Sequence, residues 1–169
     1  KSWTELPSGP KLQGACLVAH DSGIYRIGGM GAINAASEPE SIYSSASVAA
    51  FRPAKQRWQA LPPLPTGRSS HDAVVLGDAI YVVGGWNLDK SGDIDWHSSA
   101  LVCDLSQAKK TWRRIKQPFQ RRALAVASFN GRVYAIGGLT SDDTITRQVS
   151  IYDPRVGKWS TGPKLPGSM

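Results

Sequence analysis

The chain alternates short apolar runs with polar turns, and no segment has the period of a long amphipathic helix. Residues 73–76 and 79–83 are apolar runs separated by Gly77-Asp78, a two-residue hairpin signal. Ser22-Gly23 and Asn130-Gly131 occupy the same place between two other pairs of apolar runs. The pattern therefore predicts a series of antiparallel hairpins and an all-β protein.

Two sequence markers recur in phase along the chain. The second run of each hairpin ends in a glycine pair that begins at Gly28, Gly84 and Gly137, with spacings of 56 and 53 residues. A tryptophan follows each pair, at Trp58, Trp112 and Trp159, and Trp3 precedes them all. Repeats of this length are typical of solenoids and propellers.

Each repeat has room for four strands. A third apolar run follows a longer loop, at residues 47–51, 99–103 and 148–152, and a fourth surrounds each tryptophan. The sequence predicts three four-stranded antiparallel blades at residues 12–65, 66–118 and 119–169, with residues 1–11 as the outer strand of a preceding blade. Three blades do not close a ring. We therefore expect an incomplete or half propeller, whose partners are the remaining blades or a second copy of the chain.

The repeat resembles the Kelch motif, with a Gly-Gly pair after the second strand and a tryptophan in the fourth. Ile151-Tyr152-Asp153-Pro154 followed by Lys158-Trp159 is close to the family pattern, whereas Phe51-Arg52-Pro53 departs from it in the first repeat. The resemblance implies a β-propeller whose loop-rich face commonly binds the ligand. Some members of the family are enzymes, among them a copper oxidase of galactose and a sialic-acid epimerase.

Strand parity predicts which loops share one face. In a four-stranded meander, the loops between strands two and three (residues 30–40, 86–97 and 139–146) lie on the side of the interblade connections, opposite the tight hairpins. Tryptophan and arginine dominate binding hot spots, and arginine grips carboxylates or phosphates with two hydrogen bonds. The predicted ligand-binding residues are Arg68, Trp86, Asn87, Trp96, His97, Arg121 and Arg122. Alternatively, the tryptophans cover their own loop and the arginines make structural hydrogen bonds between blades.

The charge balance bears on the partner. A formal net charge of +7 and an isoelectric point of about 9.7 favour an acidic ligand or surface. The basic residues between Lys109 and Arg122 lie around an outer strand, where alternation sends neighbours to opposite sides, so nucleic acid ranks third as a ligand. No apolar run reaches the length of about 18 residues that predicts a membrane-spanning helix.

The sequence predicts no catalytic residue, metal or cofactor. Ser70-His71-Asp72 is not a triad, because neighbouring strand residues point to opposite faces. Asp89, Asp93 and Asp95 are interpreted as a solvated acidic loop rather than a calcium site, and Cys16 and Cys103 as buried thiols. The leading function is non-catalytic recognition of a protein or peptide ligand. The net positive charge adds the hypothesis that this ligand is acidic. The alternative is a carbohydrate-active epimerase or oxidase that uses Arg68, His71 and His97. The sequence gives no compartment.

Overall fold

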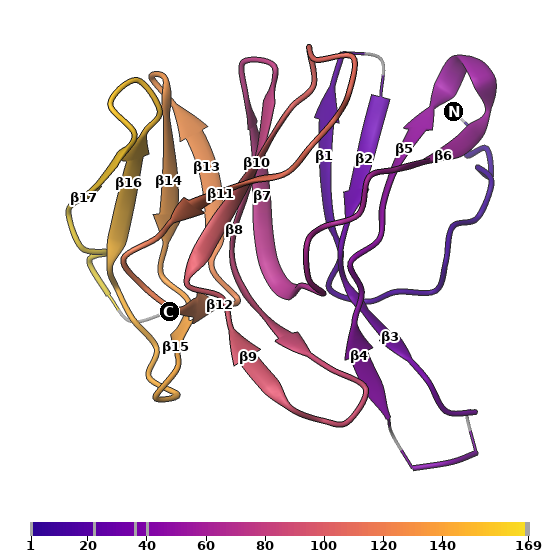
Figure 1. Ribbon diagram of the computed structural model, residues 1–169, viewed down its shortest axis with the longest axis horizontal. Coiled ribbons are helices and arrows are strands. Elements are labelled where there is room, and N and C mark those ends of the chain that lie inside the picture. Colours follow the sequence, from indigo (N-terminus) through magenta and orange to yellow (C-terminus); the bar gives the residue numbers. More distant parts are fainter. Residues whose placement is uncertain (1, 22, 36, 40, 168–169) are drawn as a thin grey trace.

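The computed structural model describes residues 2–21, 23–35, 37–39 and 41–167, and this part of the chain is almost entirely β (Figure 1). The strands are β1 (Cys16–His20), β2 (Gly23–Ile27), β3 (Met30–Ala32), β4 (Ile42–Ser44), β5 (Val48–Arg52), β6 (Arg57–Leu61), β7 (Ser69–Leu76), β8 (Ala79–Leu88), β9 (Ile94–Trp96), β10 (Ser99–Asp104), β11 (Arg113–Lys116), β12 (Arg121–Arg122), β13 (Ala125–Phe129), β14 (Arg132–Ile136), β15 (Leu139–Thr140), β16 (Val149–Asp153) and β17 (Lys158–Thr161). Helix is limited, within these residues, to the 3-10 turn η1 (Pro53–Lys55), and none of it is long and apolar enough to cross a membrane.

Three four-stranded antiparallel meanders follow one another along the chain. Their strand orders are β1-β2-β5-β6, β7-β8-β10-β11 and β13-β14-β16-β17, called blades 1, 2 and 3 below. Short ladders extend them: β3 pairs with β4, β9 with β8, and β12 with β15. The predicted all-β fold of successive blades is thereby confirmed.

The strand ends differ from the prediction in one blade. β6 and β17 contain Trp58 and Trp159, but β11 begins at Arg113, one residue after Trp112. The turn after Asp104 is longer than its counterparts, so Trp112 comes before the first paired residue. Asn130-Gly131 forms the predicted tight hairpin, with φ of 47° and 71° at the two residues. Ser22 of the first hairpin signal lies outside the described residues.

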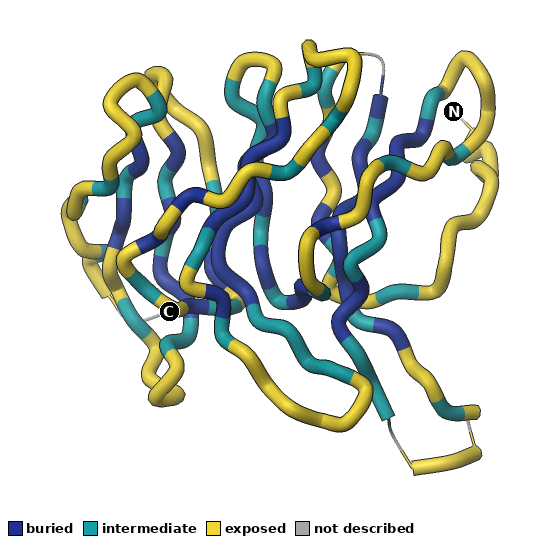
Figure 2. Tube along the Cα trace, in the orientation of Figure 1, coloured by how far each residue is buried: buried dark blue, intermediate teal, exposed yellow. Residues whose placement is uncertain are grey.

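The core lies between blades, because each inner strand is apolar on both faces. In β8, Ile80 and Val82 pack toward blade 1, while Tyr81 and Val83 pack toward blade 3. Figure 2 shows the burial concentrated along the middle of the strands, with exposed turns at both ends. Full burial of one such aliphatic side chain stabilises the fold by about 1.5–3 kcal/mol. Each face of the middle blade is therefore covered by a neighbouring blade.

One carboxylate joins all three blades. Asp72 Oδ1 in β7 accepts hydrogen bonds from the Cys16 thiol of β1 at 3.2 Å and from its neighbour Ala73 N at 2.8 Å. Its Oδ2 accepts from Val126 N of β13 at 2.7 Å. Burial and the adjacent carboxylate raise the pKa of Cys16 to about 12, so this thiol stays protonated and donates. Both cysteines are buried and free, as predicted.

The outer strands are tied to the segments that precede them. Trp58 Nε1 donates to the Pro7 carbonyl and Trp112 Nε1 to the Pro62 carbonyl, each at 3.0 Å. The strand predicted over residues 1–11 is not formed: residues 2–11 have no β-pairing, and Trp3 is fully exposed. A strand requires a hydrogen-bonded neighbour, and no sheet of a preceding blade lies beside this segment.

The two outermost blade faces are apolar and uncovered. Leu17 in β1 and Phe129 in β13 point away from the neighbouring blade and are 62% and 65% exposed. Such faces associate in water. We predict that protein prepared with this sequence forms dimers or larger species, measured by light scattering. Leu17→Glu and Phe129→Glu should shift it toward monomer, whereas Ile94→Glu, an equal change on an exposed loop strand, should not. A wild-type monomer at high concentration would contradict this prediction.

Candidate binding face

The loops between the second and third strands of each blade lie on one side of the molecule, as strand parity predicts. In Figure 1, the β3–β4 ladder, the β8–β9 ladder and the loop beyond β15 extend from the lower edge, whereas the tight hairpins lie along the upper edge. We call the lower side the loop-rich face and the upper side the turn face. The β8–β9 ladder continues blade 2 on the loop-rich face.

Three of the predicted residues form one cluster on the loop-rich face. Trp86 of β8 and Trp96 of β9 are paired across the ladder, and their rings meet edge to face with centroids 5.5 Å apart. The Arg122 guanidinium of β12 stacks on Trp86 at 4.1 Å from the ring centroid and lies 5.7 Å from that of Trp96. All three side chains are half-buried. The cluster brings together residues from two blades.

The contacts within this cluster hold its side chains in place. An edge-to-face aromatic pair contributes about 0.5–1.5 kcal/mol, and a cation on an indole contributes about 0.5–2 kcal/mol. Arg122 has neither an ion pair nor a hydrogen bond to any described residue, and of its nitrogens only Nε is buried without a partner. The two tryptophans thus cover each other and part of Arg122. The Nη1 and Nη2 groups of Arg122 remain available to donate hydrogen bonds to a ligand.

Residues that the sequence did not single out complete this face. Gln120 Nε2 donates to the Trp96 carbonyl at 2.8 Å and ties the β8–β9 ladder to the segment before blade 3. Lys90 lies over the Tyr43 ring, 5.6 Å from its centroid, and links the ladders of blades 1 and 2. Neither contact leaves a signal in the sequence, because a lone glutamine or tyrosine in a loop belongs to no motif.

Arg68 and Arg121, two other residues of the predicted ligand site, lie outside the cluster. Each is 1% exposed. Arg68 donates to the carbonyls of Gly84 at 2.6 Å and Ser99 at 3.0 Å, and Arg121 to those of Gly137 at 3.0 Å and Gln148 at 2.9 Å. Burial lowers the pKa of Arg68 to about 9 and that of Arg121 to about 10. Each arginine donates to the first glycine of a glycine pair and to a carbonyl at the start of the third strand. These contacts agree with the alternative interpretation, in which the arginines make structural hydrogen bonds.

His97 and Asn87 also serve the packing of this face. His97 is buried, and its Nε2 lies 3.0 Å from the Gly67 carbonyl. Gln117 Nε2 donates to the His97 carbonyl at 2.7 Å. Burial and the charge of Arg68 lower the pKa of His97 to about 4, so its ring is neutral at pH 7. Asn87 is half-buried beside Gly67. Of the two, Asn87 alone remains accessible to a ligand.

The residues named for the carbohydrate-enzyme alternative do not form an open site. His71 is 8% exposed, and its imidazole lies against the backbone of Gly28. Burial, with the charges of Arg68 and His97, lowers its pKa to about 3. Arg68, His71 and His97 are therefore all buried side chains. No group of three potential metal ligands occurs within the described ranges.

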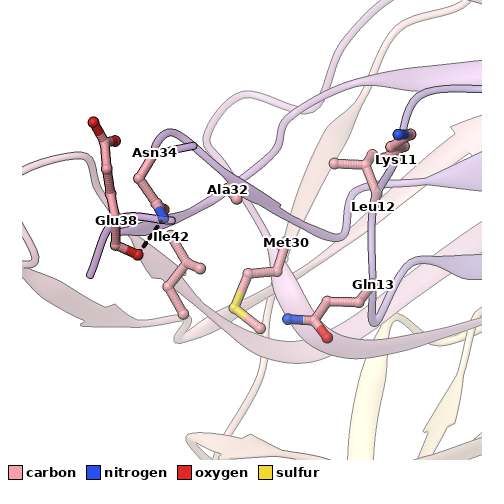
Figure 3. Close-up of a pocket in the computed structure, with 8 residues that line it drawn as sticks. All are labelled: Lys11, Leu12, Gln13, Met30, Ala32, Asn34, Glu38 and Ile42. Carbon is pink, nitrogen blue, oxygen red and sulfur yellow. Dashed lines mark hydrogen bonds between the residues drawn. The ribbon is translucent and has the colours of Figure 1, made fainter. Parts of the chain in front are cut away.

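A separate hollow of about 500 Å³ lies beside the β3–β4 ladder (Figure 3). Leu12, Met30 and Ile42 supply its apolar wall, and Gln13 pairs with Met30 through the backbone. Asn34 Nδ2 donates to the Glu38 carbonyl at 3.2 Å, and the Glu38 carboxylate points away from Met30. The hollow lies in blade 1, which has no preceding blade beside it in this structure. A covering blade would reshape it, so the Trp86–Trp96–Arg122 cluster is the better candidate for the binding site.

Stacked four-stranded meanders with their long loops on one side define a segment of a β-propeller. Comparison with known proteins supports this class. The family model described as Kelch motif matches residues 67–100 and 120–166. The solved structure of YjhT superposes with a TM-score of 0.79 at 19% sequence identity, covering 98% of this chain and 56% of that one.

Two curated relatives extend the comparison. Kelch-like protein 36 of Mus musculus is 32% identical over 114 residues, which are 66% of this chain and 18% of the relative. Beta-scruin of Limulus polyphemus is 32% identical over 122 residues, which are 68% of this chain and 13% of the relative. The chain belongs to the Kelch-repeat family. It spans less than a fifth of the length of these two relatives.

Proposed function

We propose that the chain is a non-catalytic recognition module that binds a protein or peptide through its loop-rich face. The observation that carries the proposal is the Trp86–Trp96–Arg122 cluster, which presents two indoles and an unpaired guanidinium beside the β8–β9 loop. Rigid aromatic and arginine side chains are the usual anchors of protein interfaces. Membership in the Kelch-repeat family is consistent with this function.

The cluster favours a ligand with an apolar or aromatic side chain rather than a strongly acidic one. Asp95 precedes Trp96, and Asp89 and Asp93 lie in the same loop. The negative charges of these three aspartates repel a ligand that brings several carboxylates close to Arg122. We therefore infer a bound segment that inserts an apolar side chain against the indoles and offers a backbone carbonyl or a single carboxylate to Arg122.

Selection from a displayed random-peptide library tests this function. We expect the wild-type protein to enrich peptides whose affinity falls by about 2 kcal/mol in the Trp86→Ala or Trp96→Ala variant. The melting temperatures of these two variants should stay near that of the wild type, since neither side chain is part of the core between blades. Failure to enrich any peptide relative to the Trp86→Ala/Trp96→Ala double variant would contradict the proposal.

The control is a tryptophan that packs between blades. Trp112 contacts the core between blades 1 and 2 and donates to the Pro62 carbonyl. Trp112→Ala should lower the free energy of unfolding by about 3 kcal/mol. Equal losses of stability in the Trp86, Trp96 and Trp112 variants would mean that all three indoles are structural.

A further inference from the structure

The charges of this protein are divided between its two faces. The loops between the second and third strands carry mostly acidic side chains among the described residues, with Lys90 and Arg147 as their cations: Glu38, Asp89, Asp93, Asp95, Asp142 and Asp143. The turns between the third and fourth strands, on the turn face, carry mostly cations: Arg52, Lys55, Arg57, Lys109, Lys110, Arg113, Arg155 and Lys158. The turns between the third and fourth strands are therefore rich in positive charge, whereas the loops between the second and third strands are not.

The carboxylates of these turns are already engaged within the chain. Asp153 pairs with Arg132 at 3.1 Å and with Arg155 at 2.7 Å. Asp104 accepts from the Ser106 hydroxyl at 2.6 Å and from Gln107 at 3.1 Å, and these bonds lower the pKa of its carboxyl group. Lys109, by contrast, has no hydrogen bond or ion pair to a described residue and is exposed. Its charge is available to a partner.

Lys109 and Lys110 line a groove on the outer rim, between the segment that leaves β6 and the segment that enters β11. The groove encloses about 640 Å³. Leu61, Pro62, Pro63 and Trp112 line it with apolar surface, and the indole Nε1 is already bonded to the Pro62 carbonyl. A ligand in this groove therefore meets apolar surface beside two ammonium groups.

The arrangement is repeated one blade further along the rim. A second groove of about 300 Å³ is lined by Lys116, Pro118, Lys158 and Trp159. Trp159 and Pro118 hold the positions between blades 2 and 3 that Trp112 and Pro62–Pro63 hold between blades 1 and 2. Two grooves of one composition, each lined by an interblade proline, an outer tryptophan and lysines, suit one extended chain better than two unrelated ligands.

We propose that the outer rim, from the end of blade 1 across blade 2 to blade 3, is a second interaction surface that binds an extended acidic polypeptide segment. The apolar side chains of the segment occupy the proline–tryptophan grooves, and its carboxylates pair with Lys109, Lys110 and Lys158. Charged pairs on such a rim set the partner choice and the association rate more than the final affinity. This surface is separate from the Trp86–Trp96–Arg122 cluster, and it accounts for the acidic partner class that the net charge indicates.

Fluorescence anisotropy with a labelled peptide of alternating Glu and Leu tests the surface. We expect saturable binding that weakens about tenfold in the Lys109→Glu/Lys110→Glu variant. The Lys11→Glu/Lys164→Glu variant has the same net charge and changes two exposed lysines elsewhere, so it should bind nearly as the wild type does. A peptide of alternating Glu and Ser should bind more weakly than the Leu peptide, because it leaves the grooves unfilled.

Several results would overturn the proposal. Equal losses in the two double variants would mean that the peptide senses only net charge, and the absence of saturable binding would exclude the surface. A single-stranded RNA that binds more tightly than the peptide, with the same dependence on Lys109 and Lys110, would assign the rim to nucleic acid instead. Peptide binding that persists in the Trp86→Ala/Trp96→Ala variant would show that the rim binds independently of the loop-rich face. Loss of binding in that variant would show that the peptide binds to the loop-rich face, which would overturn the proposal.

Discussion

Replacing Arg121 by alanine is expected to lower the free energy of unfolding by about 3 kcal/mol or more, whereas the same change at the next residue costs less than about 1 kcal/mol. The Arg121 guanidinium is buried and donates to the carbonyls of Gly137 and Gln148 and to the Ser150 hydroxyl. Removing it leaves the Gly137 carbonyl and the Ser150 hydroxyl without this donor, while the Gln148 carbonyl keeps its bond from Gly137 N. Urea denaturation of both alanine variants, followed by tryptophan fluorescence, measures the difference.

Arg122 is the matched control because it differs from Arg121 only in the side of the chain it faces. Its side chain stacks on half-buried indoles and makes no hydrogen bond to a described residue, so Arg122→Ala should instead weaken ligand binding. Arg68→Ala, which removes the equivalent guanidinium one blade earlier, should behave as Arg121→Ala does. Similar stability in the Arg121→Ala and Arg122→Ala variants would show that the buried hydrogen bonds contribute little.

Lowering the pH from about 7 to about 4 is expected to destabilise the protein by several kcal/mol through two buried histidines. Burial lowers the pKa of His71 to about 3 and that of His97 to about 4 in the folded protein, against a usual value of 6.5. Below pH 6.5 the unfolded chain binds protons at these rings and the folded chain does not. Stability is therefore highest above pH 6.5 and falls as the pH decreases toward 4, by about 2–3 kcal/mol for each ring.

Urea melts between pH 7 and pH 4 measure this dependence, and substitution of the two rings isolates it. The His71→Asn/His97→Asn variant removes both titrating groups, so its stability should change less over this range than that of the wild type. An unchanged slope in the variant would attribute the acid sensitivity to other groups.

The blades could be predicted from the sequence because two periodic signals agree. Alternating apolar residues identify the strands, and each glycine pair follows the apolar run of a second strand, although β8 continues through its pair to Leu88. The glycine pair of blade 2 shows why another residue type is excluded at this position. Gly84 has φ of 70°, and a Cβ atom on it would lie 2.6 Å from the Arg121 carbonyl oxygen of the next blade. Strand parity then places the loops, since it depends only on the number of strands in a blade.

The individual site residues could not be separated in this way. Arg121 and Arg122 are adjacent and identical in chemistry, and only the packing of blade 3 on blade 2 decides which of them points inward. The pairing of Trp86 with Trp96 depends on the short strand β9, which comes directly after an aspartate-rich turn and resembles a polar loop in the sequence. Residues 2–11 contain Trp3, the marker of an outer strand, but they form no β-pairing in the structure.

The Asp72 carboxylate changes how this protein should come apart. In a simple repeat protein each unit touches only its neighbours, so terminal units fray independently. Here one side chain in the middle blade is bonded to the innermost strands of both flanking blades. Loss of β13 leaves Asp72 Oδ2 without its donor, and loss of β1 removes one of the two donors to Oδ1, so partial opening at either end is penalised. The inner strands should therefore exchange their amide hydrogens as a single cooperative unit, while the outer strands, which lack such a link, open first.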